Sequence, residues 1–267
     1  MNKTKIDWCT HTWNPVTGCL HGCQYCYANA VAQRFGLAFA PRIGDPGMRG
    51  ASKYDSPEGM DTMLELKNPY ISSGRIQPYP MAFLPTFHRY RLNELERATK
   101  PRTIFVCSMG ELFGEWVPSS WIVGVLDAAK RAPQHRYLFL SKNPARYLEL
   151  DSMALLPHDK NFWYGSSVTG EESVAAYAMS GADLNLFWSM EPLLGPVDMG
   201  ASEGLPGWVI IGAETGTRKD KVVPARKWVE DIADFCAAKN IPVFYKANIR
   251  THFPDLPPSE YPWENAE

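Results

Sequence analysis

The chain has 267 residues, of which 45% are hydrophobic, and a formal net charge of −2. This length accommodates one large domain or two small ones, and the hydrophobic fraction is ordinary for a globular protein. The near-neutral charge excludes a basic field over the whole surface, of the kind that marks many nucleic-acid binders. No apolar run approaches the roughly 18 residues that a membrane span needs, so we expect no such span.

The start of the chain and its cysteines indicate a reducing compartment. Residues 1–8 (MNKTKIDW) lack the apolar core of a signal peptide, so we expect a cytoplasmic protein. Thiols stay reduced there, and a cluster of cysteines is then more typical of metal binding than of disulfides.

Short apolar runs alternate with amphipathic stretches along the chain, which predicts βα units around a parallel sheet. The expected strands cover 6–13, 102–106, 136–140, 162–165, 184–188, 208–211 and 242–245. The expected helices cover 27–35, 86–100, 118–131, a short stretch up to about 150, a stretch beginning near Glu171, and 227–239.

Three cysteines lie in one short loop between the first expected strand and the first expected helix: Cys19, Cys23 and Cys26. Thiolates from short loops hold iron–sulfur clusters, so these three can serve one metal centre. Three protein ligands on a four-iron cluster leave one iron open for a substrate or a second cofactor. The alternatives are a zinc site with His21 as the fourth ligand, or three buried structural thiols.

Glycine and proline punctuate the chain after the first helix, so we expect an irregular insertion over 36–102. It would act as a lid or a substrate-recognition element, or be a surface excursion without a role. Within it, the expected helix over 86–100 carries several cations and two aromatic residues. Its charges form either a solvated, salt-bridged face or a patch that contacts phosphates.

Polar residues follow the expected strands, at the edge where parallel barrels place catalytic groups. Ser108, Gly110 and Glu111 come after the strand over 102–106, where they bind a cofactor or form an ordinary turn. Ser166 and Ser167 follow the strand over 162–165, where they bond a ribose or cap the next helix.

Three charged residues occupy similar positions later in the chain. Lys142 ends the strand over 136–140 and is suited to a carboxylate or phosphate. Glu191 follows the strand over 184–188. Glu214 follows the strand over 208–211 and comes just after Gly212. The two glutamates would orient an ammonium group or transfer protons. The alternative is that each one caps a loop or pairs with Lys142, Arg218 or Lys246. Residues 247–267 are Pro-rich and acidic, and we expect a C-terminal strap that completes a single domain over 1–267.

The cysteine spacing, with Tyr25 in the aromatic place of Cys-x3-Cys-x-aromatic-Cys, resembles the signature of radical S-adenosylmethionine (radical SAM) enzymes. The resemblance implies an α/β fold, a partial (β/α)6 barrel, with a 4Fe-4S cluster on the three cysteines. S-adenosyl-L-methionine would bind the open iron. One electron from an external donor would cleave it to a 5′-deoxyadenosyl radical, which abstracts hydrogen from the substrate. Residues 109–111 approximate the Gly-Gly-Glu-like element that holds the cofactor's amino group, and Ser108, Ser166, Ser167 and Gly212 would add contacts to it.

Five segments are similar to a compact radical SAM-like family common in bacteriophages, and the likeness covers nearly the full length. They are residues 12–19, 107–113, 190–195, 211–216 and 243–246. The chain departs from many relatives at Gly110–Glu111, where Ser-Asp is expected.

The phage likeness implies an isomerase-type rearrangement or other modification of a hypermodified thymine, in phage DNA or its nucleotide, in the host cytoplasm. Glu191, Glu214 and Lys142 would orient cofactor and substrate. Two rival hypotheses are the same radical chemistry on a peptide or small metabolite, and a non-catalytic iron–sulfur or zinc protein that binds a partner.

Overall fold

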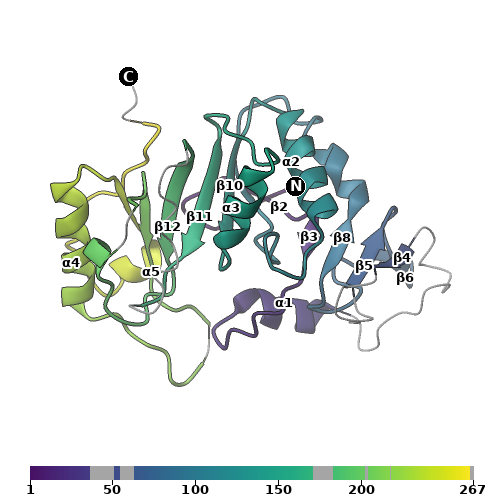
Figure 1. Ribbon diagram of the computed structural model, residues 1–267. Helices are drawn as coiled ribbons and strands as arrows, with labels where there is room; N and C mark the ends of the chain where they lie inside the picture. Colours follow the sequence, from purple (N-terminus) through teal and green to yellow (C-terminus); the bar gives the residue numbers. More distant parts are fainter. Residues whose placement is uncertain (37–50, 55–62, 171–182, 202–203, 217, 265–267) are drawn as a thin grey trace. The chain divides into compact units, whose positions relative to one another are not determined.

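The computed structural model describes residues 1–36, 51–54, 63–170, 183–201, 204–216 and 218–264 (Figure 1). The chain divides into two units. The first comprises Met1–Thr4 and Thr10–Tyr137, and the second comprises Lys5–Cys9 and Leu138–Glu267. The expectation of a single domain over 1–267 stays a prediction.

The first unit contains three neighbouring strands at one end of the main sheet. β1 (Asn2–Lys3) pairs antiparallel with β2 (His11–Trp13), and β2 pairs parallel with β9 (Thr103–Val106). Trp13 lies opposite Val106, and both side chains are buried. The apolar, β-branched run of β9 was expected, whereas the strand predicted over 6–13 is confirmed only for its last three residues. Residues 6–10 form a turn, and the backbone N–H of Cys9 bonds back to the Ile6 carbonyl.

A second, smaller sheet lies in the same unit and is built largely from the segment that we expected to be irregular. Its strand order is β3-β8-β5-β4. The bounds are β3 Val16–Thr17, β4 Ala51–Tyr54, β5 Met63–Leu66 and β8 Thr86–His88. The hairpin of β6 (Ile71–Ser72) and β7 (Arg75–Ile76) comes between β5 and β8. The described parts of 36–102 are therefore not wholly irregular. Residues 37–50 and 55–62, on which the lid hypothesis also rests, lie outside the described residues.

The helix predicted over 86–100 is wrong. Residues 86–88 form β8, which pairs on one side with β3 and on the other with β5. A 3-10 helix, η1, follows over Arg89–Glu94, and the chain then turns. The Phe87 ring is fully buried and stacks on Trp121 at 5.2 Å. Burial and pairing on both edges of β8 outweigh the helical propensity of this stretch.

Two helices of the first unit lie where the sequence places them. α1 spans Tyr27–Phe35, and the Cys26 side chain caps its first turn. Gly36 ends it, with its backbone N–H donated to the Ala32 carbonyl. α2 spans Ser119–Lys130 and begins after Pro118. α2 buries Trp121, Ile122, Val125, Leu126, Ala128 and Ala129.

The second unit contains the strands that follow in the main sheet, in the order β10-β11-β12-β13-β14, and β11 to β14 pair in parallel. The bounds are β10 Arg136–Ser141, β11 Phe162–Ser167, β12 Asn185–Met190, β13 Val209–Ile211 and β14 Val243–Tyr245. β10 begins at the last two residues of the first unit. Registers such as Ser189 opposite Ile210 and Ile211 opposite Tyr245 bring the carboxyl ends of β12, β13 and β14 to one edge.

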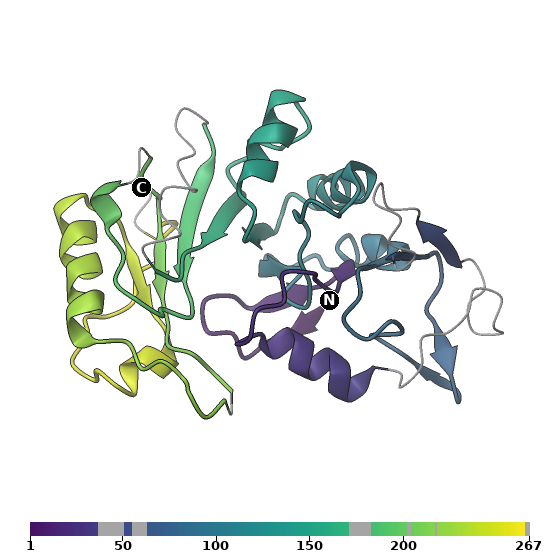
Figure 2. The same ribbon diagram turned by 60° about the horizontal axis from the view of Figure 1, so that its bottom comes forward.

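Helices complete the second unit. They are α3 (Ala145–Ser152), the short 3-10 helix η3 (Met199–Ala201), α4 (Arg226–Ala238) and α5 (Ala247–Arg250). α4 runs along one face of the sheet (Figure 2) and buries Val229, Ile232 and Cys236 in its core. This confirms the helix predicted over 227–239, and Trp228 and Phe235 pack against the same core while partly buried. The helix expected to begin near Glu171 lies outside the described residues.

The C-terminal segment packs on aromatic residues of the second unit. The rings of Tyr261 and Trp263 lie 5.8 and 5.1 Å from that of Trp208. The Trp208 indole N–H donates to the Glu260 carbonyl at 3.0 Å. The described part of residues 247–267 thus opens with α5 and then covers a buried tryptophan.

The fold is a mixed α/β fold with a mostly parallel main sheet, which confirms the predicted class. Across the described ranges, no helix combines the length and the apolar character that crossing a membrane requires.

Candidate metal centre

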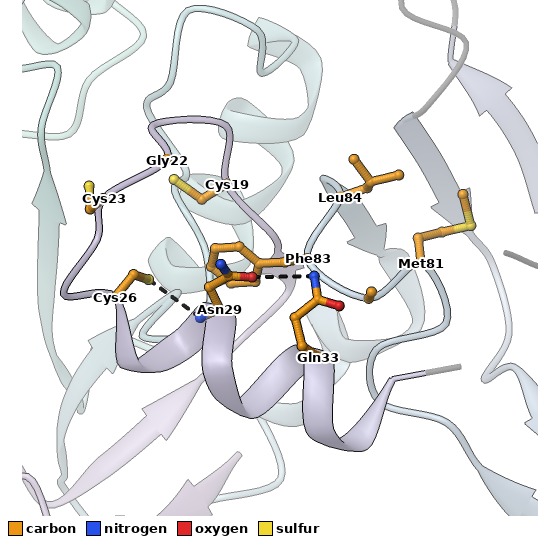
Figure 3. A pocket seen from close by; sticks show the side chains of 10 residues that line it. Cys19, Gly22, Cys23, Cys26, Asn29, Gln33, Met81, Phe83 and Leu84 are labelled. Carbon is orange, nitrogen blue, oxygen red and sulfur yellow. Dashed lines mark hydrogen bonds between the residues drawn. The ribbon is translucent and has the colours of Figure 1, made fainter. Parts of the chain in front are cut away.

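The three predicted metal ligands lie on the loop that joins β3 to α1 in the first unit (Figure 3). Cys19, Cys23 and Cys26 are all free thiols and all partly buried. This is the strand-to-helix position that the sequence indicated. The close-up shows the three side chains along one stretch of backbone that bends at Gly22.

The start of this loop is fixed by backbone contacts with two distant segments. Gly18 forms a parallel bridge with Gly110, with the Gly18 N–H donated to the Met109 carbonyl at 2.9 Å. The next N–H, that of Cys19, donates to the Phe83 carbonyl at 3.0 Å. Gly18 has a φ of +88°, and a Cβ there would collide with the backbone of Leu84. Only glycine fits such a crowded left-handed position.

The sulfur atoms accept hydrogen bonds from backbone N–H groups near them. Cys19 Sγ accepts from the His21 N–H at 3.4 Å, and Cys26 Sγ accepts from the Asn29 N–H at 3.4 Å. Such bonds stabilise negative charge on cluster thiolates and help to set cluster potentials. Burial raises the pKa of the Cys19 thiol to about 12, and the nearby Glu111 carboxylate adds to this effect. A bound metal must therefore displace the thiol proton, as metals do when they bind cysteine.

All three cysteines line one cavity of about 450 Å³. One wall is α1, with Asn29 and Gln33, whose side-chain amides lie 3.4 Å apart (Figure 3). The opposite wall is residues 81–84, which end just before β8. No local sequence pattern predicts this second wall, because it comes from a segment far along the chain.

The donor chemistry of this loop fits an iron–sulfur cluster. A four-iron cluster binds each thiolate at a different iron, so its ligands surround a volume and do not meet at one point. In the part of the chain that the structure describes, no group of three His, Cys, Asp or Glu side chains is placed to hold one metal ion. The three thiols nevertheless share one loop and one cavity, and a structural zinc site requires a fourth ligand.

The His21 side chain, the fourth ligand in the zinc alternative, contacts Glu111 and Trp116. Its Nε2 lies 3.3 Å from Oε2 of Glu111. Its ring meets Trp116 edge-on, with the centroids 4.9 Å apart. The imidazole is thus engaged with the segment that follows β9.

The residues expected to bind the cofactor's amino group lie beside the cysteine loop but make contacts within the protein. The Ser108 hydroxyl donates to Oδ1 of Asn14 at 3.1 Å, and the same oxygen accepts the Met109 N–H. Gly110 packs so closely on Gly18 that an added Cβ would lie 2.9 Å from its backbone. Tyr25 is partly buried in the loop itself. Asn14, which holds this segment, was not predicted as a site residue; it directly precedes Pro15, a pair typical of turns.

The predicted catalytic residues belong to the second unit. Glu191 follows β12 and forms a very close ion pair with Lys246, which follows β14. Lys246 Nζ also lies 3.7 Å from Asp7, and Gly212 packs against the same lysine side chain. The structure therefore brings Glu191 and Gly212 together. It also favours the pairing with Lys246 that the sequence analysis held as an alternative.

Glu214 is engaged in a second ion pair. Its two carboxylate oxygens accept from the Arg218 guanidinium at 2.8 and 2.7 Å. These hydrogen bonds hold the pKa of Glu214 below its ordinary value, and the Val222 N–H assists. The side chain is buried, with 1% of its surface exposed. A fork-to-fork pair of this kind orients both groups strongly.

The remaining predicted residues lie at other strand ends of the second unit. Lys142 directly follows β10 and is partly buried. Ser166 and Ser167 are the last two residues of β11, both buried, opposite Trp188 and Ser189. Their proposed capping role concerns a helix outside the described residues.

Two arginines of the proposed phosphate patch over 86–100 make contacts within the protein. Arg89 Nε pairs with Glu65 at 2.6 Å, and Arg91 donates to the Asn14 carbonyl at 2.7 Å. His88 is fully buried, and burial holds its pKa well below the ordinary value. These side chains stabilise the small sheet and the turn before the cysteine loop.

Comparison with known proteins gives one family. A family model described as "Protein of unknown function (DUF5131)" matches residues 3–251. The chain belongs to this family. No curated protein and no solved structure matched the chain. The DUF5131 match spans both the cysteine loop and the strand ends of the second unit, so both regions are parts of the family's sequence pattern.

Proposed function

We propose that this protein is a radical SAM enzyme that holds a 4Fe-4S cluster on Cys19, Cys23 and Cys26. The observation that carries the proposal is the position of the three thiols: they share one strand-to-helix loop and line one cavity. The spacing Cys-x3-Cys-x2-Cys, with Tyr25 before the last cysteine, adds the resemblance described above.

Each part of the loop has a defined task in this proposal. The thiols hold three irons, and the N–H groups of His21 and Asn29 stabilise charge on the sulfurs. The cavity between α1 and residues 81–84 would give S-adenosyl-L-methionine access to the cluster. When bound, the cluster would supply the electron, taken from an external donor, for reductive cleavage to the 5′-deoxyadenosyl radical.

The wider proposal places the strands in a partial (β/α)6 barrel and the protein in the cytoplasm, the host cytoplasm if a phage encodes it. The favoured substrate is a hypermodified thymine in phage DNA or its nucleotide, which the enzyme would rearrange as an isomerase or otherwise modify. This rests on the resemblance to phage proteins. The alternative substrate is a peptide or small metabolite. Salt-sensitive binding to thymine-modified DNA separates the two, because phosphate contacts weaken as salt rises.

In the second unit, we propose that Glu191, Glu214 and Lys142 orient the cofactor or the substrate. The ion pairs of Glu191 and Glu214 support a positioning role. A carboxylate that is fixed by a lysine or an arginine is held in one orientation, which suits positioning better than proton transfer.

Anaerobic turnover tests the proposal. The protein is reconstituted with iron and sulfide, then given dithionite and S-adenosyl-L-methionine, with modified DNA and nucleotide as substrates in separate reactions. We expect 5′-deoxyadenosine by mass spectrometry in the wild type and none in Cys19→Ala, Cys23→Ala or Cys26→Ala. Bound iron without cleavage under every condition would favour a non-catalytic iron–sulfur protein. Bound zinc in place of iron would favour a zinc protein that binds a partner.

A further inference from the structure

The segment that follows β9 is attached to the cysteine loop by its backbone and by one buried acidic side chain. The Glu111 N–H donates to the Gly18 carbonyl at 3.0 Å, one residue before the first cysteine. The Glu111 residue is only 5% exposed. Together with the Gly18–Gly110 bridge, this hydrogen bond holds the backbone of Glu111, and with it the Glu111 carboxylate, beside the cysteine loop.

Both oxygens of this carboxylate face groups of the protein itself. Oε1 accepts the Phe113 N–H at 2.9 Å. Oε2 lies 3.3 Å from Nε2 of His21, between Cys19 and Cys23 in the chain, without the alignment of a hydrogen bond. The carboxylate is thus turned toward the cysteine loop by contacts on both of its oxygens. That differs from the role implied by the resemblance, in which the carboxylate holds the amino group of S-adenosylmethionine.

A buried negative charge acts on any other charge nearby, because the interior screens it weakly. Oε2 of Glu111 lies 3.3 Å from His21, midway along the chain between Cys19 and Cys23, so its charge acts on the loop that would hold the irons. A negative charge beside that loop opposes an electron added to a cluster held there. Net charge around a cluster is one of the factors that set its potential.

We infer that Glu111 is a positioning residue that lowers the reduction potential of the cluster through its charge. The inference rests on the proposed function, because it requires a cluster on the three cysteines. A low potential suits a centre that must pass its electron to a sulfonium group, since a stronger reductant transfers it more readily.

The test is a redox titration of the reconstituted protein, followed by electron paramagnetic resonance. Glu111→Gln removes the charge and keeps the side-chain shape, so we expect a more positive midpoint potential. Glu115→Gln is the matched control: it makes the same change four residues later on an exposed side chain, and it should leave the potential at the wild-type value. Glu111→Asp keeps the charge but withdraws it by one methylene, so its shift should be positive and smaller.

The outcomes separate the two levels of the argument. If the wild type takes up no cluster, the proposed function fails. If the wild type and Glu111→Gln hold equal iron and have equal potentials, the role of Glu111 fails while the proposed function stands. An unchanged potential with a large loss of S-adenosyl-L-methionine affinity would overturn the inference in favour of direct cofactor binding. If Glu111→Gln takes up no iron, Glu111→Asp decides: a positive shift supports the inference, and an unchanged or lower potential overturns it.

Discussion

The cysteine loop of the first unit and the strand ends of the second unit use their polar side chains differently. In the loop, three thiols line a cavity, and those of Cys19 and Cys26 accept hydrogen bonds from backbone N–H groups. At the strand ends, Glu191 pairs with Lys246 and Glu214 pairs with Arg218. Groups that pair within the chain contribute to stability, whereas thiols along a cavity are suited to an added ligand. Substitutions in the loop should therefore change metal content, and substitutions at the strand ends should change stability.

The largest expected effect is the loss of iron from Cys23→Ala. The variant has two thiols in place of three, so reconstituted protein should hold iron near the background level while its circular dichroism spectrum stays that of wild type. Iron is measured by a colorimetric assay. Wild-type iron content in this variant would remove Cys23 from the ligand set.

Cys236→Ala is the matched control for this substitution. Cys236 lies on α4 and is fully buried in the core of the second unit. Its loss should leave iron content unchanged and lower the free energy of unfolding by about 1 kcal/mol, because it leaves a small cavity. A fall in iron content here would contradict the contrast between the two regions.

Gly18→Ala should give the largest change in stability. The residue has a φ of +88°, and a Cβ would meet the backbone of Leu84. Strain and overpacking together should cost about 3 kcal/mol in urea denaturation. Gly22→Ala is the control, because Gly22 has a φ of +67° with nothing within 4 Å of an added Cβ. It should cost only about 1 kcal/mol, from strain alone. Equal costs would contradict the tight approach at Gly18.

Glu214→Gln should lower stability in a pH-dependent way. Hydrogen bonds from Arg218 lower the folded-state pKa of Glu214 below the ordinary value of 4.5. Its stabilising effect is therefore fully present above about pH 4.5 and is lost as the pH falls through the lower, folded-state pKa. The variant should be less stable than wild type by about 1 kcal/mol at pH 7, with the difference shrinking on acidification. A difference that is constant with pH in urea denaturation would contradict this account.

The smallest expected effect concerns the ion pair at the ends of β12 and β14. Lys246→Met leaves both Glu191 and Asp7 without their shared cation, so it should cost more than Glu191→Gln. A double-mutant cycle in urea denaturation should give a coupling energy of about 1 kcal/mol between Lys246 and Glu191. Simple additivity of the two changes would show that the pair contributes nothing.

Local sequence patterns predicted the elements whose own residues show which positions are buried. The apolar runs of β9 to β14 and the amphipathic α4 carry their burial pattern in their own residues, so alternation and helical spacing were sufficient. The helix expected over 86–100 failed because its first three residues pair with β3 and β5. That pairing depends on contacts with strands far away in sequence, and no local pattern reports it.

The candidate site likewise contains residues that local sequence predicts and contacts that it does not. The three cysteines are close together in sequence, so their spacing alone predicted one loop between a strand and a helix. The wall at residues 81–84 and the contact of Glu111 with His21 join segments that are distant in the chain. Lys246 was predicted only as one possible partner of Glu191 and Glu214, because the local sequence does not indicate which carboxylate it contacts.

The measurement that tests the central claim most directly is the metal and sulfide content of anaerobically reconstituted wild type, beside the variant with Ala at positions 19, 23 and 26. A cluster on the loop predicts about four iron and four sulfide ions per chain in the wild type and background levels in the triple variant. Bound zinc without sulfide, or equal iron in both proteins, would contradict the assignment of a 4Fe-4S cluster to Cys19, Cys23 and Cys26.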